Sequence, residues 1–237
     1  MSLRIHLWSG PRNISTALMY SFAQRPDTRV VDEPLYAHYL RLTDAPHPGK
    51  AAVLASQNPD GAAVLHGLTF GPAAAPVMFY KQMAHHLVGL DESLLLHATN
   101  VLLIRDPAEV LASFSQVIGQ PTLRDIGILR QYALYESLAA AGHPPVVVSG
   151  PAIQREPARM LNALCTRLGI PFEPAMLTWT PGPRPEDGVW APWWYAAVHA
   201  SSGFEPYQPR EVRLPAHLQV LADEARPVYE KLMERGI

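Results

Sequence analysis

Five short apolar segments, separated by stretches with helical periodicity, constrain the fold of this chain more than any other feature. The apolar segments span residues 3–8, 28–34, 76–83, 98–107 and 144–150. The helical patterns span residues 15–26, 34–42, 83–97, 107–118, 122–141 and 153–168. Such alternation is typical of a mostly parallel sheet that helices cover on both faces. We therefore expect an α/β fold with three layers, α/β/α, around a sheet of about five strands.

The chain is long enough and apolar enough to form one α/β domain. It has 237 residues, of which 48% are hydrophobic and 17% charged. No repeat or linker requires a second domain, so we predict a single domain over 1–237. Two stretches are expected to depart from the sheet: an insert rich in Ala, Pro and Gly at 43–75, either mobile or covering the substrate, and a Pro- and Trp-rich C-terminal cap at 177–210.

Composition argues against several classes of partner. The net charge of −2 disfavours nucleic-acid and membrane-surface binding. No apolar run is long enough to span a bilayer, and the N-terminus is too short for a signal peptide, so we expect a cytoplasmic protein. The single cysteine, Cys165, permits no disulfide within the chain, and its helical spacing favours a buried structural thiol. No Cys, His and Asp spacing suggests a zinc site.

Polar side chains gather where the predicted strands end. They are the loop 9–16 after the first strand, Asp32 and Glu33 after the second, Lys81 in the third and Arg105 after the fourth. Ligands of parallel α/β sheets bind beyond the carboxyl ends of the strands. The sequence therefore predicts a binding site at this edge.

The first loop has the length of a phosphate-binding loop but not its residues. It reads Gly10-x-x-x-x-Ser15-Thr16, and Thr16 stands where nucleotide hydrolases have lysine. The helix N-terminus, the two hydroxyls and Arg12 would together attract an anion. The alternative is that Ser15 only caps the helix.

The fourth strand also differs from that of a metal-dependent nucleotide hydrolase. Arg105 follows the apolar strand where such an enzyme has a metal-binding Asp, and Asp106 comes one residue late beside Pro107. ATP or GTP hydrolysis is therefore disfavoured. Arg105 and Ser113 could instead hold a second phosphate, or Arg105 could form a surface pair with Asp106 and leave Ser113 in solvent.

Together the two stretches, PRxxST at 11–16 and RDPxxxxxS at 105–113, resemble the nucleotide-binding motifs of sulfotransferases. These enzymes use 3′-phosphoadenosine 5′-phosphosulfate (PAPS) and have a fold like that of P-loop nucleoside-triphosphate hydrolases. The resemblance covers roughly residues 3–170. It implies that the 5′-phosphosulfate is bound by Arg12, Asn13, Ser15 and Thr16, and the 3′-phosphate by Arg105 and Ser113. One residue departs from the family pattern: Ile14 stands where glycine is usual, and its side chain is expected to alter the turn or crowd the anion.

A later segment, PRPEDGVWAPWW at 183–194, is more loosely similar to the family's loop over the nucleotide. The resemblance implies that Arg184, Gly188 and Trp190 contact the nucleotide, with the indole stacked on adenine. The alternative is a packing cap on the sheet. The run also resembles a bacterial and plant sulfotransferase-like group, some plant members of which are labelled branched-chain aminotransferases. This chain has no room for a pyridoxal-phosphate aminotransferase fold, so we reject that activity.

Sulfuryl transfer needs a base for the acceptor proton and cations for the moving oxygens. Glu33, at the mouth of the predicted site, resembles the glutamate base of several sulfotransferases, with Asp32, His85 and His86 as alternatives. Asp32 could instead cap the helix after Pro34. The remaining expected roles are for Lys81 and Arg12 on the sulfuryl or bridging oxygen and for His85, one helical turn after Lys81, on the acceptor.

The sequence thus predicts a metal-independent, PAPS-dependent sulfotransferase that acts on a hydroxyl of a small molecule or glycan. Two alternatives stay open: a P-loop small-molecule kinase, and a non-catalytic relative that binds a nucleotide or anion. The segments 36–75 and 190–210 are expected to shape the acceptor pocket. A homodimer is compatible with the sequence.

Overall fold

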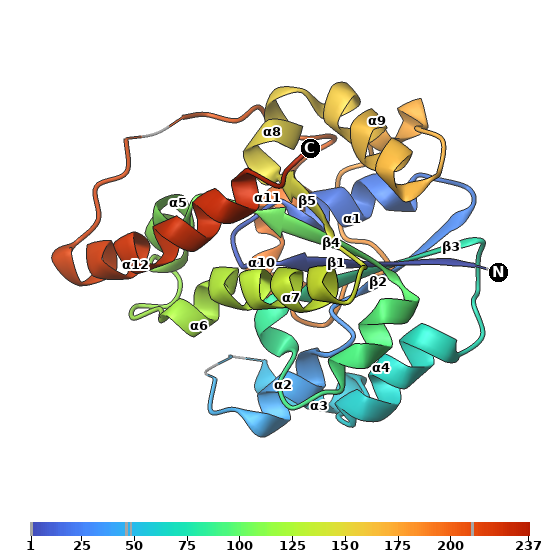
Figure 1. Cartoon of the computed structure of the whole chain (residues 1–237), viewed down its shortest axis with the longest axis horizontal. Coiled ribbons are helices and arrows are strands. Elements are labelled where there is room, and N and C mark those ends of the chain that lie inside the picture. Colours follow the sequence, from blue (N-terminus) through green and yellow to red (C-terminus); the bar gives the residue numbers. More distant parts are fainter. Residues whose placement is uncertain (1, 46, 48, 210) are drawn as a thin grey trace.

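A five-stranded parallel sheet forms the centre of the molecule (Figure 1). The computed structural model describes residues 2–45, 47, 49–209 and 211–237. The strands lie in the order β2-β3-β1-β4-β5, and all pairs are parallel. They are β1 (Leu3–Ser9), β2 (Thr28–Asp32), β3 (Val77–Met83), β4 (Thr99–Ile104) and β5 (Val146–Ser149). The predicted sheet of five parallel strands is confirmed.

Helices cover both faces of the sheet, because alternate strand residues point to opposite sides. Leu7 and Leu103 pack into one core cluster with α1 (Ser15–Ala23), α8 (Gly150–Arg155) and α9 (Pro157–Leu168). Their neighbours Trp8 and Leu102 pack into a second cluster with helices on the opposite face. These helices are α4 (Gly61–Phe70), α5 (Pro107–Phe114), α7 (Ile128–Ala140) and α12 (Ala216–Met233). The predicted three layers are therefore present.

Several predicted helices end earlier or break, and local residues explain where. The helix expected over 83–97 is wrong: two 3₁₀ helices, η1 (Ala84–His86) and η2 (Glu92–His97), flank Gly89 at φ 61°. The pattern over 122–141 divides at Gly127, φ 74°, into α6 (Leu123–Ile126) and α7. The pattern over 153–168 lies in α8 and α9, which meet at Pro157, a residue that disfavours helical geometry just before it.

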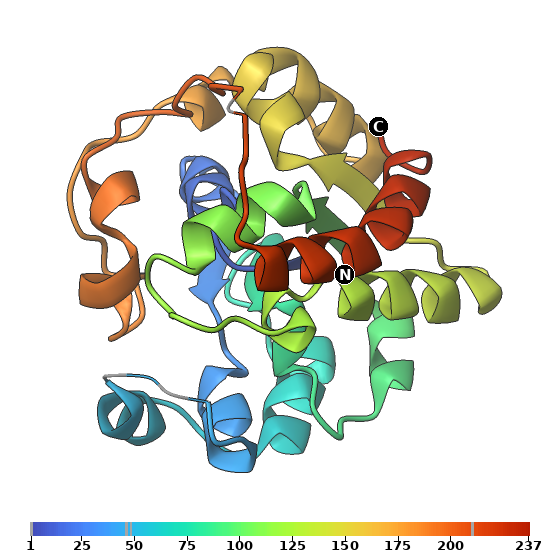
Figure 2. The ribbon, with the colours of Figure 1, turned by 90° about the vertical axis from the view of Figure 1, so that its left-hand side faces the viewer.

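The two stretches expected to leave the sheet contain short helices. In 43–75, of which residues 46 and 48 lie outside the described part, α3 (Lys50–Ser56) follows α2 (Tyr36–Leu42) and precedes α4. In 177–210, of which residue 210 lies outside it, α10 (Ala191–Trp194) and α11 (Ala196–His199) follow η3 (Pro174–Leu177). A third core cluster joins α2, α3 and α10. Figure 2 shows the orange segment with α10 and α11 at the left, over the blue helices α2 and α3.

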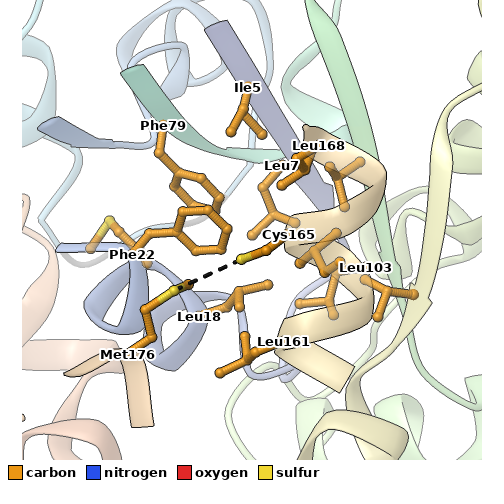
Figure 3. Close-up of a cluster of buried hydrophobic side chains, with 14 of the residues drawn as sticks. Ile5, Leu7, Leu18, Phe22, Phe79, Leu103, Leu161, Cys165, Leu168 and Met176 are labelled. Atoms are coloured by element: carbon orange, nitrogen blue, oxygen red, sulfur yellow. Dashed lines mark hydrogen bonds between the residues drawn. The ribbon is translucent and has the colours of Figure 1, made fainter. Parts of the chain in front are cut away.

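Cys165 lies in the core, as its helical spacing predicted (Figure 3). Its Sγ is 3.9 Å from the Met176 sulfur, and the thiol is fully buried among Leu18, Leu161 and Phe22. Burial raises the pKa of the thiol to about 11.

No helix in the described part of the chain is both long and apolar enough to cross a membrane.

We expect Cys165 to be inert toward thiol reagents in the folded protein, because both its burial and its raised pKa suppress the reactive thiolate. Labelling with a chromogenic disulfide at pH 8 should be absent without denaturant and stoichiometric in urea. Rapid labelling of the folded chain would contradict this packing.

Candidate active site

A buried lysine forms the centre of the site at the carboxyl ends of β2 and β3. The Lys81 ammonium, 1% exposed, donates hydrogen bonds to Asp32 Oδ1 at 2.9 Å, Glu33 Oε1 at 2.5 Å and the Tyr195 hydroxyl at 2.6 Å. An ammonium has three N–H donors, so protein acceptors occupy all of them. Lys81 therefore has no free donor for a ligand in this arrangement.

Strand register brings the first two partners together. Asp32 is the β2 residue opposite Lys81, and both side chains are on the face of the sheet that bears α1. Glu33 continues the pairing through its N–H to the Lys81 carbonyl at 2.8 Å, and then turns with φ 38°. Asp32 does not cap the next helix, because α2 begins after Leu35 without a side-chain cap. That alternative is therefore wrong.

The late segment supplies the other partners of Asp32. The Tyr195 hydroxyl donates to Asp32 Oδ2 at 2.7 Å and accepts from Trp190 Nε1 at 3.0 Å. The backbone N–H of Gly188 donates to the same carboxylate oxygen at 3.1 Å. Asp32 thus accepts hydrogen bonds from Lys81, Tyr195 and Gly188. Sequence reasoning missed Tyr195, because nothing local links residue 195 to residue 32.

These contacts shift the pKa values of Lys81 and Glu33. Burial opposes the charge of Lys81, but Asp32 and Glu33 outweigh it and raise the pKa of Lys81. Burial raises the pKa of Glu33, Lys81 opposes that rise, and the Asp32 charge adds to it. Asp32 accepts hydrogen bonds from three donors, whereas Glu33 accepts from Lys81 and lines a cavity, so Glu33 is the carboxylate that a molecule in the cavity can reach.

A cavity of about 560 Å³ connects this cluster to the first loop. One part of its wall is the phosphate-loop candidate, and another is aromatic and apolar. The loop contributes Pro11, Arg12, Asn13, Ser15 and Thr16; the buried cluster contributes Glu33, Lys81 and Tyr195; the apolar and aromatic part includes Tyr36, Tyr39, Leu40, Met83, Phe114 and Trp194. The structure therefore brings these loop residues, Glu33 and Lys81 to one hollow.

The loop closes without glycine at position 14. Its left-handed residue is Arg12, φ 54°, whereas Ile14 has φ −79°, which any residue adopts. The Ile14 side chain packs against the core cluster and is absent from the cavity wall. The expected crowding by Ile14 is thus not found. Ser15 does not cap α1, since no side-chain cap bond is present there, so its hydroxyl is left to the cavity.

Arg12, Arg105 and Ser113 meet beside this loop. Arg12 Nε donates to Ser113 Oγ at 3.0 Å, and Arg105 Nη1 donates to the Arg12 carbonyl at 2.6 Å. Arg105 also pairs with Glu109 at 2.9 Å. Burial lowers the pKa of Arg12, and the Arg105 charge lowers it further. The alternative pair of Arg105 with Asp106 is wrong, because Arg105 pairs with Glu109 while Asp106 caps α5 through the Ala108 N–H at 2.8 Å and pairs with Arg226 at 3.2 Å.

The structure does not bring Arg184, Gly188 and Trp190 to the cavity wall. Trp190 is 2% exposed, so its ring lies in the core rather than open to an adenine. Gly188 allows the indole to approach, since a Cβ there would lie 2.1 Å from a Trp190 ring atom. The Arg184 guanidinium lies over the Tyr20 ring at 4.7 Å. This placement agrees with the alternative interpretation, in which the segment is a packing cap on the sheet.

The two histidines line the cavity as neutral side chains. Burial lowers the pKa of His85 to about 4 and lowers that of His86 well below its ordinary value. The His86 ring stacks with Tyr36 at 4.6 Å and with Tyr39 at 4.7 Å. They follow β3 in a 3₁₀ helix, so the α-helical spacing expected between Lys81 and His85 is wrong.

Among the residues described, no group of three or more His, Cys, Asp or Glu side chains is placed to hold a metal.

Comparisons with known proteins agree on one family. A sequence model described as "Sulfotransferase domain" matches residues 3–236. Two Arabidopsis thaliana proteins named branched-chain-amino-acid aminotransferase-like protein 2 and protein 1 are 39% and 40% identical over 229 residues. That alignment covers 96% of this chain and 41% of each relative, so the chain spans about two fifths of their length. Their names contain the branched-chain aminotransferase label that some plant members of the resembled group have.

Solved structures share the fold at low sequence identity. The sulfotransferase domain of the Synechococcus PCC 7002 olefin synthase has a TM-score of 0.52 at 16% identity, with 94% of this chain and 95% of that chain covered. A sulfotransferase from Alicyclobacillus acidocaldarius has a TM-score of 0.54 at 13% identity, with 100% and 98% covered. These likenesses support the P-loop-like α/β fold.

Gly188→Ala is expected to destabilise the protein by about 1–3 kcal/mol, because the added Cβ would displace the buried Trp190 ring beneath the site. Gly67→Ala is the matched control: it lies in α4 with no atom within 4 Å, and should raise stability by about 0.5–1 kcal/mol. Urea unfolding of both variants measures the difference. Equal stability for the two variants would contradict the described packing.

Proposed function

The chain belongs to the sulfotransferase domain family, and we propose on that premise that it transfers a sulfuryl group from PAPS to a hydroxyl of a small molecule or glycan. One observation carries the proposal. The cavity places a buried carboxylate with a raised pKa, Glu33, on the same wall as an arginine-bearing loop at a helix N-terminus. A base and an anion site on one hollow are what this transfer requires.

The first loop is suited to hold the phosphosulfate. The N-terminus of α1 presents backbone N–H groups, and Ser15 and Thr16 add hydroxyl donors at the cavity. Arg12 adds the cation that Thr16 cannot supply, which favours sulfuryl transfer over the kinase alternative. Arg105 and Ser113 are proposed to hold the 3′-phosphate beside it, with Glu109 orienting Arg105.

Glu33 is proposed to act as the general base. As the acceptor oxygen forms its bond to sulfur, the bond from sulfur to the 5′-phosphate oxygen breaks. The acceptor proton passes to Glu33, and adenosine 3′,5′-bisphosphate leaves with the electron pair of the broken bond. Protonation of Glu33 removes one negative charge from a buried cluster that holds two carboxylates and one ammonium, so the cluster favours proton uptake.

Lys81 is proposed to position Glu33 rather than to touch the sulfuryl oxygens, because its three N–H donors are held by protein groups. Its charge remains after Glu33 is protonated and is then balanced by Asp32. The transferred group would be stabilised from the loop side, by Arg12 and the α1 N-terminus. The neutral His85 and His86 are proposed to contact the acceptor.

Adenosine 3′,5′-bisphosphate should raise the melting temperature by about 5–10 °C at a hundredfold excess over its dissociation constant. Arg105→Ala and Ser113→Ala should each remove most of this shift, since both side chains flank the loop. Arg159→Ala, which affects an exposed pair with Glu156, is the control and should keep the shift. No shift in the unaltered protein at millimolar nucleotide would refute donor binding.

The rate of transfer should rise with pH through the pKa of Glu33, since only the ionised carboxylate accepts the proton. Glu33→Gln should lower kcat by about 10²–10⁴-fold. Asp32→Asn removes a like charge that raises the pKa of Glu33, so the acidic limb of the pH–rate profile should move to lower pH. An unchanged acidic limb in Asp32→Asn, with the variant folded by circular dichroism, would argue against Glu33 as the base.

A further inference from the structure

The cavity beside Glu33 continues into a second hollow at the surface. This outer groove has a volume of about 800 Å³. Four residues belong to the walls of both spaces, which are therefore adjoining parts of one channel: Asp44, Ala45, Ile118 and Trp194. A molecule that reaches Glu33 through this opening would pass along the outer groove.

The outer groove exposes apolar side chains. Val117 is 51% exposed and Trp193 is 44% exposed, and both line it together with Ile118. The charged groups on its wall are Asp44 and Lys50, and the Lys50 ammonium already donates to the Thr43 carbonyl at 3.0 Å. Large exposed apolar side chains that gather at one hollow mark a binding surface more often than single ones do.

Aromatic and neutral side chains also line the inner part of the channel. Tyr36, Tyr39 and Phe114 line it, and the two histidines there are neutral. Apart from Arg12 of the loop and the Lys81–Glu33 pair, the charged side chains on this wall are Asp44, Arg124 and Asp125. Asp125 already accepts hydrogen bonds from the Thr122 N–H at 2.8 Å and the Thr122 hydroxyl at 2.7 Å. An uncharged reacting end with an apolar continuation fits this wall.

We propose that the acceptor is an amphiphile, with its reacting hydroxyl at Glu33 and an apolar chain or ring system along the groove beside Val117 and Trp193. This inference rests on the proposed function and narrows its acceptor. A glycan would need polar partners for several hydroxyls along the path, whereas the large side chains of the outer wall are mostly apolar: Val117, Ile118 and Trp193. Of the polar residues there, the ring nitrogens of His47 lie within hydrogen-bond distance of the Gly49 N–H and Trp194 Nε1, Lys50 donates to the Thr43 carbonyl, and Asp44 is charged. Contact of the tail with these side chains would take apolar surface out of water.

Linear alkyl sulfates, the products expected from alkanols, test the tail site without turnover. Calorimetric titration from methyl to octyl sulfate, below the micelle concentration, should show affinity rising about two- to fourfold per methylene. Trp193→Ser and Val117→Ser should flatten this rise and leave methyl sulfate binding unchanged. Val220→Ser, at a 63% exposed position on α12, is the matched control and should keep the full rise. Equal affinities for methyl and octyl sulfate, or the same rise in all variants, would overturn the proposal.

A transfer assay with PAPS separates this inference from the proposed function. Preference for 1-octanol over ethanol and methyl glucoside, lost in Trp193→Ser, supports both. Transfer to the glucoside without any effect of alkyl length overturns the amphiphile and leaves the sulfotransferase proposal standing. Chain-length-dependent binding of alkyl sulfates without transfer to any alcohol supports the tail site and contradicts the proposed activity.

Discussion

The buried ammonium of Lys81 is the charge around which the site is organised. Removing an ammonium from water costs several kcal/mol unless its donors are paired. Here Asp32, Glu33 and Tyr195 each accept a hydrogen bond from the ammonium, so all three donors are paired. The Tyr195 hydroxyl and the Gly188 N–H in turn donate to the second oxygen of Asp32. Deleting any one partner would leave a charge or donor unpaired in the interior. The same contacts that permit burial of the lysine therefore fix the proposed base.

This requirement explains why Trp190 of the late Pro- and Trp-rich segment is buried against the cluster rather than open to the cavity. Trp190 and Tyr195 lie against the cluster, and Asp187 ties the segment to α1 by accepting from the Tyr20 hydroxyl at 2.7 Å. His199 reaches the same carboxylate at 2.9 Å. The segment thus contributes to the stability of the site. Its Trp193 and Trp194 also line the outer groove, together with Val117 and Ile118.

Much of the fold was predictable because apolar runs of strand length are local signals. All five strands lie where the sequence predicts them, and the loop, Glu33 and Lys81 meet as the strand ends require. The prediction of a helix over 83–97 was wrong because Gly89 and the Asp91 cap favour two short 3₁₀ helices. Hydrophobic periodicity does not detect such local breaks. Trp190 was misplaced because aromatic content alone does not distinguish a ligand platform from core.

The sequence by itself determined the parallel sheet, the two arginine-bearing motifs and the carboxylate at the mouth of the site, since each is set by residue type and spacing along a few neighbouring residues. Only the tertiary structure decided which of these groups are free to act. Lys81 is saturated by partners 48, 49 and 114 residues away, and Ile14 packs against the core while Arg12 takes the left-handed conformation. Hydrogen-bond satisfaction is a property of the folded surroundings, so the sequence names candidate donors but only packing shows which are already occupied.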